Sequence, residues 1–420
     1  MTTILFGSGA TVPFFEPKLT TSYLTKQVMN LEKWEGVVEE YRRHTSNTIA
    51  DVSEIDEVLK RLDGLLNTCG RESNFEVLAE LIDKIASLGF DRMPGNNLMN
   101  TLLAFIVKEY KYDFGPEWRD VPFLFREIIA QSILELERNS KVKDYDVLCG
   151  KQHDFIEWVS KTDKKVSLVS LNYDNVLFDS IKGLGFSHCF DYAPQAGNMD
   201  SFDYFQFRDS DKAVYFPHGH TRFKRNSFDA IQYFDNPEEA EKQRWAGVGD
   251  NTVNSSLTLL DSTFSYNFNT FITTGQTKDT ALNMSPYDAY YQRLSRDLQD
   301  SDWIYIIGYS FGDEHINRLL HSYLYSNPFG NILIVDLIKE DVKVKDDVLN
   351  GNGLLRKLYD NFKPQKFMPD TPDYGEFEFS EGWDVNSQGY GKLWGRINLY
   401  KKGIIEFLSE YKDVVFKVTV

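Results

Sequence analysis

Short runs of apolar residues, each followed at once by polar residues or glycine, recur along this chain. The longest are Val166–Leu171 and Trp303–Ile307, and shorter ones lie at Thr3–Phe6, Ala213–Phe216 and Ile332–Val335. Such runs, rich in β-branched and aromatic side chains, are typical of strands buried in a parallel sheet. The sequence therefore predicts five strands, and residues 268–274 form another possible strand.

Apolar residues at helical spacing follow several of these runs. Val176, Leu177 and Ile181 come after the second predicted strand, and Ile316 and Leu320 come after the fourth. Strands that alternate with helices are typical of an α/β fold. The pattern predicts a Rossmann-like doubly wound parallel sheet.

The stretch from about residue 20 to 160 has only helical patterns, which is far too long for an ordinary crossover helix. It predicts a large helical insertion that covers a site or forms an interface. A second insertion is expected at about 225–267, and residues 341–420 form a C-terminal segment of unknown role. Within the insertion the clearest helical positions are Ile55, Val58, Leu59, Leu62 and Leu66, and Leu124, Ile128, Ile129 and Ile133.

Glycine and polar residues stand directly after the predicted strands. In an open parallel sheet, ligands bind in the crevice beyond the carboxyl ends of the strands, so these residues are placed to meet a ligand. The candidates, in chain order, are Gly7, Ser8, Gly9, Ala10, Thr11, Asn172, Asp174, His218, Gly308, Tyr309, Ser310 and Asp336.

These residue types suit the binding of a dinucleotide. Glycines in a strand-to-helix turn let the backbone approach a pyrophosphate, and Asp336 at a strand end could hold ribose hydroxyls. His218 lies next to Gly219, where an imidazole base could reach a ribose hydroxyl. His220 ranks second for that role, because strand alternation would turn it the other way. A simpler interpretation of Asn172 is that its side chain caps the next helix, as Asn often does.

Composition and charge limit the remaining classes. The formal net charge of −17 argues against a protein that binds nucleic acid without a partner. The three cysteines are far apart, which disfavours a disulfide framework and a cysteine zinc site. The chain has neither eighteen consecutive apolar residues nor a signal-peptide pattern, so a soluble cytoplasmic protein without a membrane span is expected.

The four strand ends Gly7–Thr11, Asn172–Asp174, His218–Gly219 and Gly308–Ser310 occur in the order seen in sirtuins. The chain resembles the sirtuin-like proteins of bacterial antiphage defence, in which the sirtuin fold cleaves NAD instead of deacylating proteins. The resemblance covers the α/β core, roughly residues 1–14, 163–225 and 268–340.

The chain departs from the deacylase pattern in several places. Thr11 stands where sirtuins have Ser, Leu171 replaces the Gln before the Asn, and Pro13–Phe15 is a reduced form of the Pro-Asp-Phe-Arg segment. The four zinc cysteines of the deacylases are missing after His218. No zinc is therefore expected, and the acyl-lysine groove is in doubt whereas the NAD pocket is not.

The resemblance implies that residues 1–340 form a sirtuin-like NAD-binding catalytic domain that hydrolyses the bond between nicotinamide and ribose. By the resemblance, Asp174 would hold the nicotinamide carboxamide, Asn172 would orient the water and the ribose, and His218 would act as the base. The two glycine turns would cradle the pyrophosphate, and Asp336 would hold the adenosine ribose.

The resemblance also implies a setting. The protein would be an NAD glycohydrolase that depletes NAD in abortive infection, assembled as a homo-oligomer with a partner such as a HerA-like ATPase. Three alternatives remain at this point: a non-catalytic sensor of NAD or ADP-ribose, a nuclease-type partner protein, and a hydride-transfer dehydrogenase. The chain lacks the third glycine of the Gly-x-Gly-x-x-Gly turn, which disfavours a dehydrogenase. It also lacks a cluster of metal-binding carboxylates, which disfavours a nuclease.

Overall fold

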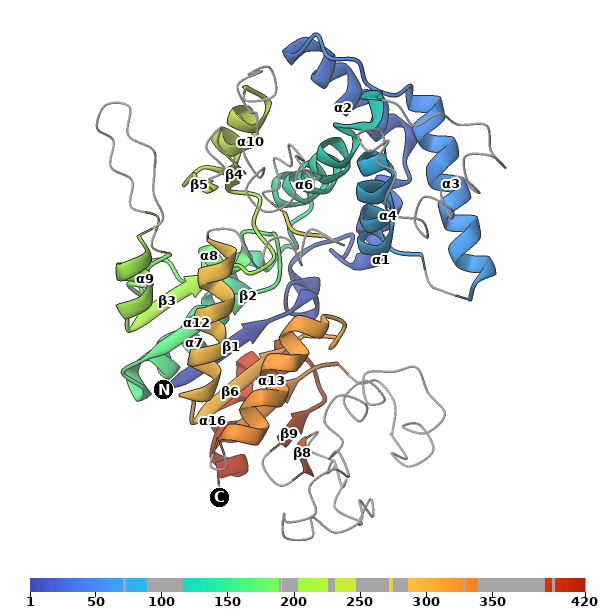
Figure 1. The fold of residues 1–420 in the computed structure, drawn as a ribbon. Coiled ribbons are helices and arrows are strands. Elements are labelled where there is room, and N and C mark those ends of the chain that lie inside the picture. The colour runs from blue at the N-terminus through green and yellow to red at the C-terminus, as the bar shows by residue number, and fades with distance from the viewer. Residues whose placement is uncertain are drawn as a thin grey trace, which may run out of the picture.

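A seven-stranded sheet forms the centre of the molecule (Figure 1). Its strands are β1 (Thr2–Phe6), β2 (Val166–Ser170), β3 (Lys212–Tyr215), β6 (Trp303–Ile307), β7 (Asn331–Val335), β8 (Tyr390–Trp394) and β9 (Ile397–Tyr400). The order across the sheet is β3-β2-β1-β6-β7-β9-β8. All pairs from β3 to β9 are parallel, and β8 is antiparallel to β9 at the edge.

The computed structural model describes most of the chain. The described residues are 1–70, 73–88, 116–188, 190, 203–225, 231–246, 272–274, 286–327, 330–337, 390–394 and 397–419.

The five strands predicted from the apolar runs are confirmed as β1, β2, β3, β6 and β7. Counted along the chain, the six parallel strands have the order 3-2-1-4-5-6, which is the doubly wound order of Rossmann-like folds. The α/β, Rossmann-like prediction is thus confirmed. The order of the strands reverses between β1 and β6, and such a switch point is where these sheets bind ligands.

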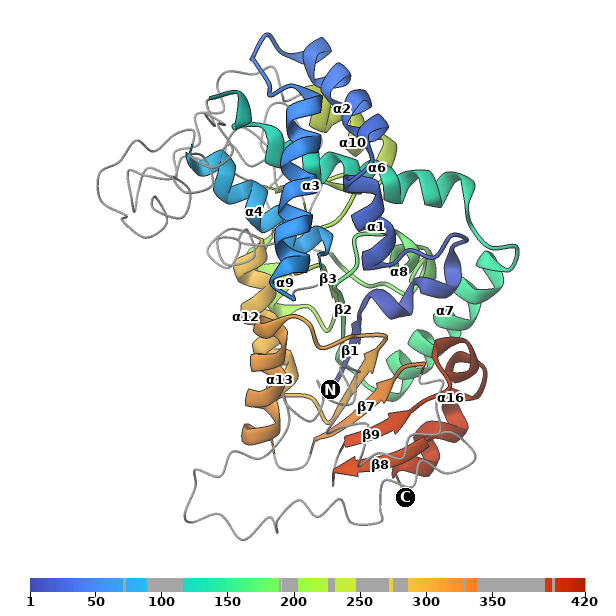
Figure 2. The same cartoon turned by 90° about the vertical axis from the view of Figure 1, so that its right-hand side faces the viewer.

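Helices cover both faces of the sheet (Figure 2). On one face, α12 (Tyr287–Gln299) packs beside α13 (Glu314–Ser326). On the other face, α7 (Tyr145–Thr162) packs beside α16 (Ile404–Thr419), which has a kink at Glu410. The strands are therefore buried on both sides, in agreement with their continuous apolar sequences.

A separate group of helices lies beyond the carboxyl ends of the strands (Figure 1). These helices precede α7 in the chain and pack mainly on one another. Leu62 of α3 and Ile128 of α6 are among the predicted helical positions, and both are buried. The group consists of α1 (Thr21–Val28), α2 (Leu31–His44), α3 (Val52–Thr68), α4 (Phe75–Leu88) and α6 (Val121–Asn139).

The C-terminal segment completes the sheet. β9 pairs with β7, and Phe407 of α16 packs on Phe155 of α7 with a centroid distance of 5.2 Å. The predicted boundary near residue 340 therefore falls between two strands that are neighbours in one sheet.

The described part of the region predicted as a second insertion, about 225–267, begins at the end of a short strand and contains another short strand and a helix. β4 (Phe223–Arg225) and β5 (Ile231–Tyr233) form an antiparallel pair, and α10 (Pro237–Ala246) follows. The strand predicted at 268–274 lies mostly outside the described residues, although Ile272 forms an isolated bridge with Gly219.

Short 3-10 turns and small helices connect these elements. They are η1 (Ser8–Ala10), η2 (Val12–Phe14), η3 (Pro116–Trp118), α8 (Val176–Ser180) and α9 (Tyr204–Asp209). Among the described helices, none is both long enough and apolar enough to span a bilayer.

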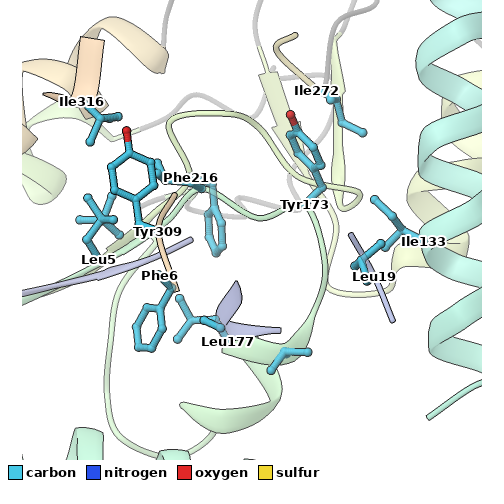
Figure 3. Close-up of a cluster of buried hydrophobic side chains, with 14 of the residues drawn as sticks. Leu5, Phe6, Leu19, Ile133, Tyr173, Leu177, Phe216, Ile272, Tyr309 and Ile316 are labelled. Carbon is cyan, nitrogen blue, oxygen red and sulfur yellow. The ribbon is translucent and has the colours of Figure 1, made fainter. Parts of the chain in front are cut away.

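A continuous apolar cluster joins the sheet to the helical group. Figure 3 draws Tyr309 with Leu5 and Ile316 on one side of this cluster, and Leu19 with Ile133 of α6 on the other. The helical group is therefore packed against the strand ends and forms one side of the space above them.

Candidate functional site

A cavity of about 480 Å³ lies beyond the carboxyl ends of β1, β2, β3 and β6, at the switch point of the sheet. Its volume is in the range typical of small-molecule sites. Part of its wall comes from the strand ends and part from the helical group. The lining residues are Gly7, Ser8, Thr11, Leu19, Thr20, Thr21, Leu24, Asn74, Phe75, Glu76, Ile133, Leu171, Asn172, Tyr173, Asp174, His218, Tyr309, Ser310, Gly312 and Asp313.

The glycine turns after β1 and β6 touch each other at the floor of the cavity. The amide of Gly9 donates to the carbonyl of Gly308 at 2.8 Å. A Cβ on Gly7 would lie 2.6 Å from the Gly308 carbonyl oxygen, and one on Gly308 would lie 2.1 Å from the Ala10 nitrogen. Gly308 also has a φ of +62°. Glycine is required at these positions because the two backbones touch. The sequence pattern had indicated only that the glycines would let a ligand approach the backbone.

Three backbone amides at these turns can receive an anion. The amides of Ser8, Ser310 and Gly312 have no hydrogen-bond acceptor within the described part of the chain, and all three residues line the cavity. Unpaired amides at the start of a helix are suited to a phosphate group.

Asn172 follows β2 and is buried. Its Nδ2 donates to the carbonyl of Gly7 at 2.9 Å, and its backbone amide donates to Ser170 Oγ at 3.1 Å. These bonds tie the β2 end to the β1 turn and leave Asn172 Oδ1 to accept from a bound molecule. Asn172 does not cap α8, whose N-cap residue is Asn175.

Asp174 has one carboxylate oxygen without a hydrogen bond. Oδ1 accepts from the amide of Val176 at 3.1 Å, whereas the buried Oδ2 has no partner within the described residues. Burial raises the pKa of Asp174 to about 6. A buried, unpaired carboxylate oxygen at a cavity wall can accept from a ligand amide, which lowers the cost of burial.

The two histidines have different surroundings. His218 lines the cavity, and His220 is fully buried outside it. His220 Nδ1 accepts from the Arg222 amide at 3.1 Å, and its Nε2 lies 2.6 Å from the Asp174 carbonyl oxygen, to which it donates. Burial keeps the pKa of His220 well below its usual range. His220 therefore holds the Asp174 loop, and His218 is the histidine that can meet a ligand.

Two acidic residues at the site were not identified from the sequence. Asp313 Oδ2 lies 2.9 Å from His218 Nε2, and both side chains are buried. Glu137 of α6 accepts from the backbone amide of Asn175 at 2.6 Å and from its side-chain amide at 2.7 Å. Asp313 follows a Gly-x-Ser turn and begins a helix, and that position was the signal available in the sequence.

Helix α6 supports the loops of the site in two further places. Arg126 donates to the carbonyl of Thr274 at 3.3 Å. Glu127 accepts from Arg244 at 2.8 Å, and Arg244 donates to the carbonyl of Thr221 at 2.8 Å. Thr221 in turn bonds to the backbone of the Asn172–Asp174 loop, since its amide and hydroxyl both donate to the Tyr173 carbonyl at 3.1 Å.

The structure brings most, but not all, of the predicted residues to the cavity. Gly7, Ser8, Thr11, Asn172, Asp174, His218, Tyr309 and Ser310 line it. Gly9, Ala10 and Gly308 lie behind this surface, in the contact between the turns. Asp336 follows β7 without lining the cavity, and its carboxylate accepts from the amide of Leu337 at 2.6 Å.

The charge of the cavity wall is acidic. Glu76, Asp174 and Asp313 line it, and its described lining includes neither lysine nor arginine. A wall of this kind favours a ligand with positive charge at one end, while the free amides at the glycine turns receive its anionic part.

No group of three or more His, Cys, Asp or Glu side chains suitable for a metal ion occurs among the described residues. The segment after His218 instead packs aromatic rings together, with Phe223 and Tyr233 of the β4–β5 pair at a centroid distance of 6.4 Å.

The fold and the site define an α/β protein of Rossmann-like topology with a polar, acidic cavity at its switch point. No protein-family model matches this chain, and no curated protein matches it either.

Proposed function

We propose that this protein is a sirtuin-like NAD hydrolase that cleaves the bond between nicotinamide and ribose, giving nicotinamide and ADP-ribose. The observation that carries the proposal is the convergence of Asn172, Asp174 and His218 on one cavity, which residues of the two glycine turns also line. These residues come from two different strand ends, and the resemblance to sirtuins rests on the same residues.

The reaction places definite demands on a site. The bond between the pyridinium nitrogen and ribose C1′ breaks, and its electron pair neutralises the nicotinamide. Positive charge then develops on the ribose as in an oxocarbenium ion, and water adds to C1′ and loses a proton. An acidic wall, whose described lining includes no lysine or arginine, favours both the cationic substrate end and this transition state.

Each residue has a role that its surroundings support. Asp174 Oδ2 accepts from the carboxamide of nicotinamide, because it is buried and has no other partner among the described residues. Asn172 Oδ1 orients the water or a ribose hydroxyl, because Nδ2 is held by Gly7. His218 takes the proton. The amides of Ser8, Ser310 and Gly312 receive the pyrophosphate.

The test is chromatographic detection of nicotinamide and ADP-ribose after incubation with NAD, for the protein alone and with proteins encoded beside it. Asn172→Ala and His218→Ala are expected to lower turnover by about 100-fold or more. Asn67→Ala is the matched control, since Asn67 is exposed on α3 and its side chain bonds to Asp63 of the same helix.

Retained turnover in Asn172→Ala would contradict the assignment. An absence of NAD cleavage under all conditions, together with measurable binding of ADP-ribose, would instead favour the non-catalytic sensor.

The biological setting is a proposal that the resemblance alone supports. We place the hydrolase in an antiphage system, as a cytoplasmic homo-oligomer that acts with a partner such as a HerA-like ATPase and depletes NAD on infection.

A further inference from the structure

We infer that Asp313 is a positioning residue that acts through His218, so that the working base is a carboxylate–histidine pair. The two residues come from opposite sides of the switch point. His218 follows β3, and Asp313 lies between β6 and α13. The sheet order places β2 and β1 between these strands, so the contact of 2.9 Å between Nε2 and Oδ2 joins the two outer strand ends of the four below the cavity.

Asp313 is held rigidly by its own helix. Its Oδ1 accepts from the amides of His315 at 2.9 Å and Ile316 at 3.2 Å, which caps α13. Its backbone amide donates to the hydroxyl of Tyr309 at 3.2 Å. The two carboxylate oxygens are thus divided between two tasks, with Oδ1 capping the helix and Oδ2 facing His218.

His218 is held from the opposite side through its backbone. The His218 carbonyl accepts from the amide of Thr273 at 2.8 Å, and Gly219 next to it has a φ of +84°. Nε2 is buried and lies at ion-pair distance from Asp313 without the alignment of a hydrogen bond. Catalytic hydrogen bonds are often poorly aligned before a substrate binds and tighten afterwards.

This arrangement assigns separate roles to the two ring nitrogens. A carboxylate beside Nε2 favours the tautomer with its proton on Nε2, and it stabilises the imidazolium once a proton has been taken. Nδ1 is then the nitrogen that accepts the proton from water or a ribose hydroxyl. The other ionisable side chains of the cavity wall are Glu76, Asp174, Tyr173 and Tyr309.

The catalytic consequence rests on the proposed hydrolase function, whereas the pairing itself can be measured without turnover. Asp313→Asn is the decisive variant, because Asn caps a helix as well as Asp does and removes only the charge facing His218. Asp203→Asn is the matched control, since Asp203 caps α9 through the amide of Gln206 at 2.8 Å.

With NAD as substrate, Asp313→Asn is expected to lower kcat by about 100-fold to 10,000-fold with ADP-ribose affinity and melting temperature unchanged. In a His218→Ala background the same substitution is expected to cause no further loss of kcat, because its effect passes through the histidine. Equal losses in both backgrounds would overturn the inference.

Side-chain 1H–15N correlation spectra of 15N-histidine-labelled protein keep the test independent of activity. We expect the His218 ring to be the Nε2–H tautomer in the wild type. The populations of its tautomers should change in Asp313→Asn and stay the same in Asp203→Asn. If the wild type does not cleave NAD, the proposed function fails and these spectra still decide the pairing. An unchanged His218 signal in Asp313→Asn would refute it.

Discussion

Glu137 accepts hydrogen bonds from both the backbone and the side-chain amide of Asn175, at 2.6 and 2.7 Å. Burial and the neighbouring Asp174 raise the pKa of Glu137 to about 7, and burial raises that of Asp174 to about 6. Asp174 belongs to the loop that follows β2, and Glu137 of α6 bonds to the next residue of that loop, so two carboxyl groups with pKa values near neutrality meet there.

These shifts predict how stability changes with pH. A carboxyl group whose pKa is higher in the folded protein binds more protons there than in the unfolded chain. Such a group contributes to the free energy of unfolding. This contribution is complete below the pKa of the group in the unfolded chain and is lost as the pH rises through its pKa in the folded protein. We therefore expect the free energy of unfolding to fall as the pH rises from about 4 to about 7, by at most about 1.4 kcal/mol per pH unit for each group.

Urea denaturation at several pH values checks this prediction. Glu137→Gln removes one titrating group and keeps an acceptor oxygen for Asn175, so its stability should depend less on pH across this range. A pH dependence identical to that of the wild type would show that Glu137 does not titrate there.

The two neighbouring histidines should separate function from stability. His218→Ala is expected to remain folded with its melting temperature little changed, because Nε2 makes no aligned hydrogen bond. His220→Ala is expected to cost about 2 kcal/mol or more, because it leaves the Arg222 amide and the Asp174 carbonyl unpaired. Thermal denaturation of both variants tests this difference, and equal stabilities would contradict it.

Gly308 and Gly36 offer a matched pair of glycine substitutions. Gly308→Ala should lose more than about 2 kcal/mol, because of the positive φ and the contact of a Cβ with the Ala10 nitrogen. Gly36 lies inside α2 with open space around it, so Gly36→Ala should gain about 0.5–1 kcal/mol. Chemical denaturation measures both, and a neutral Gly308→Ala would argue against the contact between the glycine turns.

The sequence predicted the parts of the fold that depend on continuous burial. β2, β6 and β7 are buried on both faces, and their apolar runs marked them directly. β9 was missed because Ile397–Tyr400 is short and carries Asn398 in its middle. A strand with such a weak pattern is defined by its pairing with β7, which the sequence alone does not display.

The candidate site divides in the same way. Asn172, Asp174 and His218 were predicted because each stands directly after an apolar run, and parallel strands end at one edge. Asp313 has the sequence pattern of an ordinary helix cap, and its approach to His218 arises only from the order of the strands across the sheet. Glu137 lies near the end of a helix among other charged residues, where nothing in the sequence distinguishes it.

The buried ion pair between Glu127 and Arg244 gives a further prediction. Arg244→Met leaves a fully buried carboxylate without its partner, and we expect a loss of about 3–5 kcal/mol. Replacing both residues, as Glu127→Leu with Arg244→Met, should cost less than the single change.

Urea unfolding compares these variants with a surface control. Arg318→Met, which breaks the exposed pair with Glu314 on α13, should cost less than about 1 kcal/mol. A loss in Arg244→Met as small as that of the surface control would contradict the structural role of the buried pair.

The contacts of α6 have a thermodynamic consequence. Helix α6 bonds to Thr274 and Asn175 and reaches Thr221 through Arg244. The position of α6 is therefore coupled to the positions of the loops after β2 and β3. Any molecule that binds the helical group and displaces α6 must change the affinity of the cavity for its ligand. Linkage is reciprocal, so a ligand in the cavity must change the affinity for that molecule by the same factor.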